Sequence, residues 1–191
     1  MNRLADVALA GIGLVLTSPV LAAAAAAIKL EDGGPVLYRQ TRVGKDGRDF
    51  EVLKLRSMVV GAEHRGAGYA VDRGDARITR VGRFVRRTSI DELPQLWNVV
   101  RGDMSVIGPR PTLRYQVERY DARQRRRLAV RPGLTGWAQV HGRAALPWAD
   151  RIELDVPDVE HRSPLLDLKI LVRTPLALLG GTYREGTGGW R

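Results

Sequence analysis

The chain has 191 residues and a formal net charge of +10, and all but four of its 31 basic residues are arginines. This length favours one domain. The absence of cysteine excludes disulfides and thiolate metal sites, and the three histidines lack a zinc-binding spacing. Arginine binds phosphate through paired hydrogen bonds, so the expected partners are anionic: nucleic acid, lipid headgroups or a nucleotide.

An uncharged apolar run covers residues 7–28. As a helix it would measure roughly 33 Å, enough to cross a bilayer. Pro19 removes a backbone donor at its middle and predicts a sharp bend, and the Ser18 hydroxyl is a nearby partner for a freed carbonyl. A kinked spanning helix, a signal peptide cleaved within residues 22–27 and a re-entrant helix all fit. Asp6 in the leader argues against the signal peptide.

Two patterns follow in the chain. Asp46-Gly47 between the apolar segments 36–38 and 50–53 predicts a β-hairpin. Arginines then recur at three- and four-residue steps, which would place them on one helix face. Such a row is usually solvated, but its position just before an acidic pair favours contact with headgroups or substrate phosphates. The row consists of Arg77, Arg80, Arg83 and Arg87.

The acidic pair is Asp91-Glu92. A helix is expected to begin near Asp91, with Pro94 in its first turn and Gly102 after its end. Both acids could serve only as helix caps. Alternatively, a helix N-terminus attracts phosphate and keeps a carboxylate ionised, and an ionised aspartate can attack phosphorus or bind a divalent cation.

Arg110 lies between two prolines, in Gly-Pro-Arg-Pro at 108–111. This rigidity suits an oriented phosphate clamp, with an ordinary turn as the alternative. The glycines of 131–137 either admit a ligand close to the backbone or only form turns. The arginine run at 123–127 fits a solvated face or contact with lipid phosphate.

A last helix is expected from Pro164, with an interruption at Pro175. Its leucine-rich pattern fits either the membrane interface or packing against the domain core.

Four motifs in this order resemble the bacterial sugar transferases, specifically the small monotopic polyprenyl-phosphate phosphoglycosyl transferases. Each motif alone is weak, but together they are specific, and the resemblance extends from about residue 3 to 179. The Ser18-Pro19 pair also matches the family's helix break. The motifs are Ser-Ile-Asp-Glu-Leu-Pro-Gln at 89–95, Asn-Val-Val-Arg-Gly-Asp-Met-Ser at 98–105, Gly-Pro-Arg-Pro at 108–111 and Arg-Pro-Gly-Leu-Thr-Gly-Trp at 131–137.

The resemblance implies an α+β, mostly helical fold in three parts. Residues 1–32 would form a re-entrant membrane helix broken at Ser18-Pro19. Residues 33–180 would form a compact cytosolic catalytic domain, with a small β-hairpin and interfacial amphipathic helices. Residues 181–191 would be a flexible tail. Without an added multi-pass region the chain resembles a minimal functional form, on the cytoplasmic face of the inner membrane and in contact with inner-leaflet lipids.

The family transfers a sugar-1-phosphate from a UDP-sugar to undecaprenyl phosphate and releases UMP, as the first membrane step of glycoconjugate biosynthesis. Its mechanism passes through a covalent phosphosugar on an aspartate. By position, Asp91 would be the nucleophile and the Mg²⁺ ligand, and Glu92 its acid/base or electrostatic partner. The residues expected to hold phosphate or nucleotide groups are Arg86, Arg87, Arg110 and Arg143.

The sequence also leaves alternatives and departures from the family pattern. A nonenzymatic basic module that binds membrane or nucleic acid would explain the charge, although no aromatic residues interleave with the arginine run, so we expect no nucleic-acid partner. Asp158 stands where relatives carry a tyrosine, and His141 where many carry a polar amide. The resemblance to the smallest members favours an N-acetylated or diacetamido donor sugar. The downstream product, whether glycoprotein, capsule or exopolysaccharide, stays open.

Overall fold

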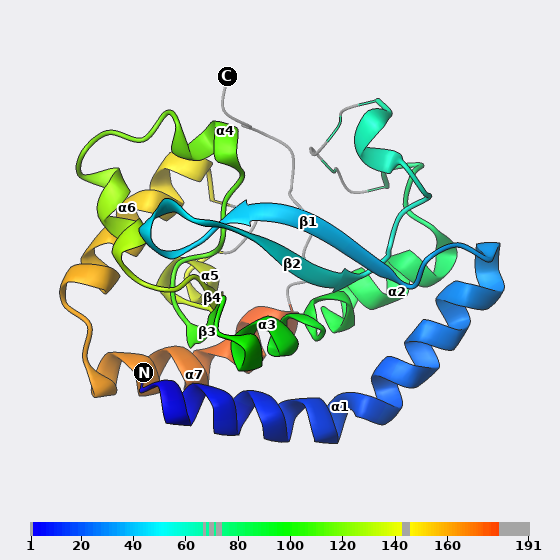
Figure 1. Cartoon of the computed structure of the whole chain (residues 1–191), viewed down its shortest axis with the longest axis horizontal. Coiled ribbons are helices and arrows are strands. Elements are labelled where there is room, and N and C mark those ends of the chain that lie inside the picture. The colour runs from blue at the N-terminus through cyan, green and yellow to red at the C-terminus, as the bar shows by residue number, and fades with distance from the viewer. Residues whose placement is uncertain (1, 67, 69–70, 72–73, 143–145, 180–191) are drawn as a thin grey trace.

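The computed structural model describes residues 2–66, 68, 71, 74–142 and 146–179. This part of the chain is mostly helical with little sheet, as the sequence predicts (Figure 1). The expected tail at 181–191 lies outside the described residues. The helices are α1 (Arg3–Asp32), α2 (Arg80–Arg87), α3 (Gln95–Arg101), α4 (Arg114–Val117), α5 (Trp137–Val140), α6 (Trp148–Glu160) and α7 (Pro164–Leu179). The strands are β1 (Leu37–Val43), β2 (Asp49–Leu55), β3 (Ser105–Ile107) and β4 (Gly133–Thr135).

The apolar N-terminal segment forms the long helix α1, which changes direction about midway along its length (Figure 1). Pro19 lies inside this helix and has no N–H to donate to the carbonyl of Val15. The Ser18 hydroxyl donates to that carbonyl instead, at 2.8 Å. The proline bend and its hydroxyl partner are therefore confirmed.

Polar side chains bind the N-terminal end of α1 to the rest of the molecule. Arg3 donates to the backbone carbonyls of Val99 and Val100 at 2.5 and 2.7 Å, at the end of α3. The buried Asp6 carboxylate accepts from the hydroxyl of Ser105 at 2.9 Å and from the backbone N–H of Val106 at 2.8 Å. The start of α1 is thus fixed to α3 and β3.

The C-terminal end of α1 is bound to the same body. The Glu31 carboxylate accepts from the backbone N–H groups of Arg80 and Val81, at 2.7 and 3.2 Å, and so caps α2. Asp32 forms an ion pair with Arg56. Between its two bound ends, α1 exposes a row of apolar side chains. They are Leu4, Val7, Leu9, Ile12, Val15, Leu16, Val20 and Leu30.

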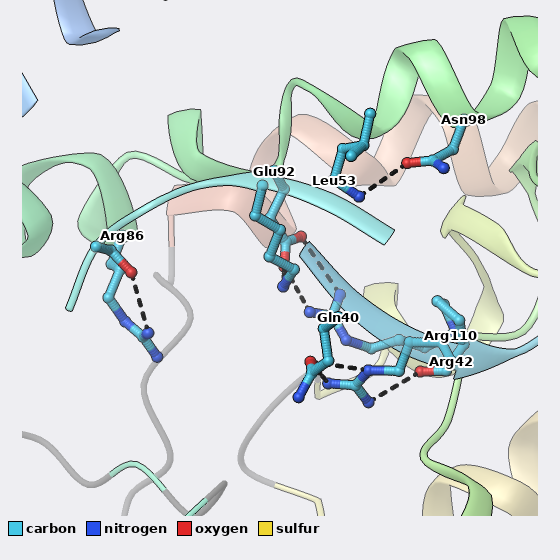
Figure 2. Close-up of polar contacts among 10 residues, drawn as sticks. Gln40, Arg42, Leu53, Arg86, Glu92, Asn98 and Arg110 are labelled. Carbon is cyan, nitrogen blue, oxygen red and sulfur yellow. Dashed lines mark hydrogen bonds and ion pairs between the residues drawn. The ribbon is translucent and has the colours of Figure 1, made fainter. Parts of the chain in front are cut away.

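The expected β-hairpin is confirmed: β1 and β2 are antiparallel, with Leu37 opposite Leu55 and Val43 opposite Asp49. Its turn needs the left-handed conformation, which Gly47 adopts at φ 75°. Asn98 of α3 holds the hairpin through its side-chain amide, which accepts from the N–H of Leu53 (Figure 2) and donates to the carbonyl of Glu51. The hairpin therefore has a fixed position over α3.

The two glycine-containing motifs meet through a short parallel pair of strands, β3 and β4. A Cβ on Gly133 would lie 2.1 Å from the backbone nitrogen of Gly108, and one on Gly136 would lie 2.2 Å from the Gly108 carbonyl oxygen. These glycines are needed because two backbone segments pack against each other. Close backbone packing is thus a third role, which differs from both the ligand contact and the turns left open by the sequence.

The arginine run at 123–127 faces carboxylates of α6. Arg127 and Asp155 form a buried ion pair at 2.5 Å, and Arg127 also donates to the backbone carbonyl of Arg110. At the surface, Arg123 pairs with Glu153, and Arg126 pairs with Glu160. The run therefore joins two parts of the domain instead of presenting a row of free charges to lipid.

Two helix boundaries differ from those predicted. Arg77 does not belong to the arginine-bearing helix, because Thr79 caps α2 by accepting from the N–H of Gly82 at 2.9 Å. The Arg77 guanidinium instead pairs with Asp75 and donates to loop carbonyls. The last helix starts at Pro164 as predicted, but it continues through Pro175, which lies about one turn from its end and removes only one backbone donor.

Candidate active site at the Asp91-Glu92 pair

The acidic pair lies in a single 3-10 turn, Ile90–Glu92, between α2 and α3. Ser89 adopts a left-handed conformation with φ 58°, which separates the turn from α2. Helix α3 begins only after Pro94. The prediction that Asp91 starts this helix is wrong, because the turn and the proline delay the helix by about one turn. Asp91 therefore does not cap α3.

Glu92 is buried between two cations from different parts of the fold. Lys54 of β2 donates to its carboxylate at 2.9 Å, and Arg110 donates with both terminal nitrogens at 2.5 and 3.3 Å (Figure 2). Burial opposes ionisation, but the charges of Arg110 and Lys54 outweigh it and hold the pKa of Glu92 well below its ordinary value. Of the two roles expected for Glu92, the electrostatic one fits this geometry.

Asp91 has a different environment although it is adjacent in sequence. Its side chain is 4% exposed, and its Oδ1 atom has no hydrogen-bond partner among the described residues. Burial, reinforced by the charge of Glu92, raises the pKa of Asp91 to about 6. The expectation that a helix terminus lowers this pKa is thus wrong. An unpaired carboxylate oxygen of this kind is available to attack an electrophile or to bind a cation.

A cavity of about 690 Å³ opens beside the pair, within the size range of small-molecule sites. The hairpin forms one wall, and the segment before α4 and the start of α6 form others. One part of the lining is cationic and another is apolar. The charged residues that line it include Arg42, Lys54, Arg56, Arg86, Asp91, Glu92, Arg110 and Arg151, and the apolar ones include Leu37, Met58, Val59 and Leu113.

A family model described as bacterial sugar transferase matches residues 1–181. The chain belongs to the bacterial sugar transferase family. This membership confirms the resemblance seen in the motifs, and it places the Asp91-Glu92 cavity in an enzyme family.

Three sugar transferase relatives show the extent of the similarity. The chain is 46% identical over 187 residues, 95% of its length, to an Aeromonas hydrophila UDP-N-acetylgalactosamine-undecaprenyl-phosphate N-acetylgalactosaminephosphotransferase. It is 46% identical over 93% of its length to a Caulobacter vibrioides UDP-glucose:undecaprenyl-phosphate glucose-1-phosphate transferase. It is 42% identical over 91% of its length to an uncharacterized sugar transferase of Bacillus subtilis. The matches span 44%, 69% and 85% of those proteins, respectively, so the chain spans less than half of the Aeromonas relative.

The sugar transferase cavity brings together most of the residues singled out from the sequence. Arg86 and Arg110 line it with the acidic pair. Arg87 is exposed and is not part of the lining. Arg143 lies outside the described residues.

Sequence reasoning missed Lys54, Gln40 and Arg42, which also line this cavity. A single lysine on a strand carries no motif, so only the fold reveals its contact with Glu92. For Gln40 and Arg42 the sequence did contain a usable pattern. Side chains two positions apart on a strand lie on the same face, so the predicted hairpin places these two together.

The two departures from the family pattern lie away from the cavity lining. Asp158 is buried in α6, where burial and the charge of Asp155 raise its pKa to about 6. His141 is exposed and contacts the Arg173 guanidinium at 2.6 Å.

The acidic pair offers carboxylate oxygens, which are ligands that Mg²⁺ binds. Among the described residues, no three His, Asp or Glu side chains converge as a metal site. Proteins commonly hold Mg²⁺ through one or two carboxylates, with substrate phosphates and water as the other ligands. Asp91 lines the cavity and offers one unpartnered carboxylate oxygen. The residues present therefore fit an ion whose coordination is completed by substrate.

Proposed function

We propose that the chain transfers a sugar-1-phosphate from a UDP-sugar to undecaprenyl phosphate and releases UMP. The names of the Aeromonas and Caulobacter relatives describe transfers of this kind. One observation carries the proposal to this chain. Asp91, whose Oδ1 atom is buried without a hydrogen-bond partner, lines a cavity of about 690 Å³ beside the Lys54–Glu92–Arg110 group, which would place a nucleophile next to phosphate-binding cations.

The proposed reaction has two steps. In the first, an ionised Asp91 oxygen forms a bond to the sugar-linked phosphorus of the donor, and the bond to UMP breaks with its electron pair leaving on UMP. In the second, a phosphate oxygen of the lipid acceptor attacks the same phosphorus and releases Asp91. A covalent aspartyl phosphosugar links the steps, so one small cavity need not hold donor and lipid acceptor at the same time.

The cations of the site would stabilise the charge that develops during both steps. Arg110 and Lys54 lie on Glu92, and Arg86 lines the same cavity. Glu92 would keep the first two cations oriented rather than exchange a proton itself. We propose Mg²⁺ as the cofactor, held by Asp91 and the substrate phosphates, where it would neutralise part of the diphosphate charge.

We also propose that α1 is a re-entrant helix on the cytoplasmic side of the inner membrane. Both of its ends are bound to one body, through Asp6 at the start and Glu31 at the end, while its apolar side chains are exposed. A spanning helix would need its ends on opposite sides of the bilayer. Figure 1 shows α7 at the same edge of the molecule, and α7 also exposes apolar side chains, at Leu165, Leu168, Val172 and Leu176.

The activity is tested by measuring UMP release from a panel of UDP-sugars with Mg²⁺ and undecaprenyl phosphate. We expect UMP release with at least one donor. In Asp91→Asn the rate of release should fall by about 10³-fold or more, because the amide cannot attack phosphorus. The matched control is Asp150→Asn, an exposed aspartate outside the cavity lining, which should keep full activity. Full turnover by Asp91→Asn would refute the assignment, and no release from any donor would refute the function.

A further inference from the structure

Arg42 of β1 lies in the cavity without a role in the reaction described above. Its guanidinium is half-buried and is held by one neighbour on the same face of the strand. The Gln40 side-chain oxygen accepts from the Arg42 Nε at 3.0 Å and from Nη2 at 2.5 Å (Figure 2). The third contact is long, at 3.4 Å from Nη1 to the backbone carbonyl of Pro111. Gln40 thus fixes the plane of the guanidinium from one edge.

The charge of Glu92 acts on Arg42, but Glu92 pairs directly with two other cations. Among the described residues Arg42 forms no ion pair, whereas Lys54 and Arg110 share the single carboxylate of Glu92. Burial and the like charge of Arg110 lower the pKa of Arg42 to about 10. A partly buried cation beside a second cation is unfavourable unless an anion joins them. A negatively charged ligand bound between Arg42 and Arg110 would therefore stabilise both cations.

The position of this cation pair relative to the acidic residues suggests the ligand. Figure 2 shows Arg86 on one side of Glu92, and Arg110, Arg42 and Gln40 on the other. Both sides line the same cavity. Cations on both sides of Glu92, the sequence neighbour of Asp91, suit two phosphate groups, and a planar guanidinium binds phosphate oxygens in pairs.

We propose that Arg42 and Arg110 form a phosphate-binding subsite, in which Gln40 is a positioning residue that orients the Arg42 guanidinium. The ligand is a phosphate group, either of the donor diphosphate or of the lipid acceptor. The assignment of these two sources rests on the proposed function, whereas the binding of phosphate does not.

The test uses the full chain in detergent, with UDP as the binding probe and the two half-reactions as kinetic probes. Arg42→Gln removes the charge, and Arg42→Lys keeps the charge but loses the planar fork. The matched control is Arg39→Gln, the same change on the opposite, exposed face of the same strand. Charge-assisted hydrogen bonds of this kind predict a loss of about tenfold or more in Arg42→Gln, a smaller loss in Arg42→Lys and no change in the control.

The two phosphate sources give different results. Weaker UDP binding and slower UMP release without acceptor assign the subsite to the donor. Unchanged UDP binding with slower transfer to undecaprenyl phosphate assigns it to the acceptor. If neither changes in a folded Arg42→Gln protein, the subsite does not exist. If wild type binds UDP in an Arg42-dependent way but transfers no sugar, the subsite stands and the transferase function fails.

Gln40→Glu separates a binding role from a structural one. The new carboxylate would give Arg42 the ion-pair partner that it lacks, so the melting temperature should rise or stay the same. The same carboxylate would compete with phosphate, so the affinity for the phosphate source identified above should fall by about tenfold. A purely structural role for the Gln40–Arg42 contact predicts undiminished binding in this variant, and that result would overturn the proposal.

Discussion

At the scale of single residues, the neighbours Asp91 and Glu92 are buried together but differ in their contacts. Glu92 is held by Lys54 and Arg110, so its negative charge is stabilised. Asp91 keeps an unpartnered oxygen and a raised pKa, because it is buried beside that charge. In the proposed mechanism this difference gives each carboxylate its own role: Glu92 orients the cations, and Asp91 attacks phosphorus.

The raised pKa of Asp91 makes a pH dependence testable. Because only the ionised carboxylate attacks, kcat/KM for the donor should rise as the pH increases towards about 6 and level off above it. In Glu92→Gln the neighbouring negative charge is gone, so the pKa of Asp91 falls. The midpoint of the residual activity should therefore move to lower pH. The measurement is UMP release across the acidic and neutral range. A midpoint that stays in place or moves up would contradict this account of Asp91.

The sequence predicts mainly those site residues that belong to recognisable motifs. The motifs contain Asp91, Glu92 and Arg110, the family resemblance adds Arg86, and all four line the cavity. They could not predict which carboxylate is neutralised, because that depends on Lys54, which lies 38 positions away from Glu92 in the chain. The direction of the Asp91 pKa shift differs from the prediction because the motifs do not show the burial that raises it.

At the scale of elements, the buried pair Arg127–Asp155 connects α6 to the segment that carries Arg110. Asp155→Ala would leave Arg127 buried without a counter-charge, which typically costs about 3–5 kcal/mol of unfolding free energy. Glu153→Ala, which removes the half-exposed partner of Arg123, should cost less than about 1 kcal/mol. Denaturant unfolding of both variants measures the difference. If both variants lost the same unfolding free energy, burial would not make the Arg127–Asp155 pair more important for stability than the exposed pair.

Whether α1 spans the membrane or returns to the same side can be tested by labelling. The absence of native cysteine makes single-cysteine labelling clean. With a re-entrant helix, Asn2→Cys should react with a membrane-impermeant maleimide only after cells are permeabilised, as should the exposed domain position Ala122→Cys. Labelling of position 2 in intact cells, with position 122 still protected, would show that α1 spans the membrane.

Elements with strong local signals were predictable, and those decided by distant contacts were not. The Asp46-Gly47 turn and the Pro19 bend each follow from backbone geometry within a few residues. The arginine run at 123–127 looked like a free charge row, because its carboxylate partners lie on a helix about 30 residues later, as with Glu153. The start of α3 differs from the prediction because the 3-10 turn at Ile90–Glu92 and Pro94 come before the helix, and the sequence does not distinguish that turn from a first helical turn.

At the scale of the whole molecule, the fold brings an exposed apolar helix and a cation-lined cavity into one small body. Asp6 at the start of α1 binds Ser105 of β3, and β3 leads within a few residues to Arg110. At the other end, Glu31 caps α2, which carries Arg86, and Asp32 pairs with Arg56 just after β2. The apolar helix and the catalytic cations are thereby held in one frame, which suits a reaction between a soluble nucleotide and a lipid.

The central claim is that Asp91 carries the phosphosugar between the two substrates. The most direct measurement is incubation of the protein with a donor labelled in its sugar, without any polyprenyl phosphate, followed by mass spectrometry of the peptide that contains Asp91. We predict label on Asp91 in amounts up to one per chain, UMP released in equal amount, and loss of label when polyprenyl phosphate is added. A wild-type protein that never carries label, and releases UMP only when the acceptor is present, would contradict the claim.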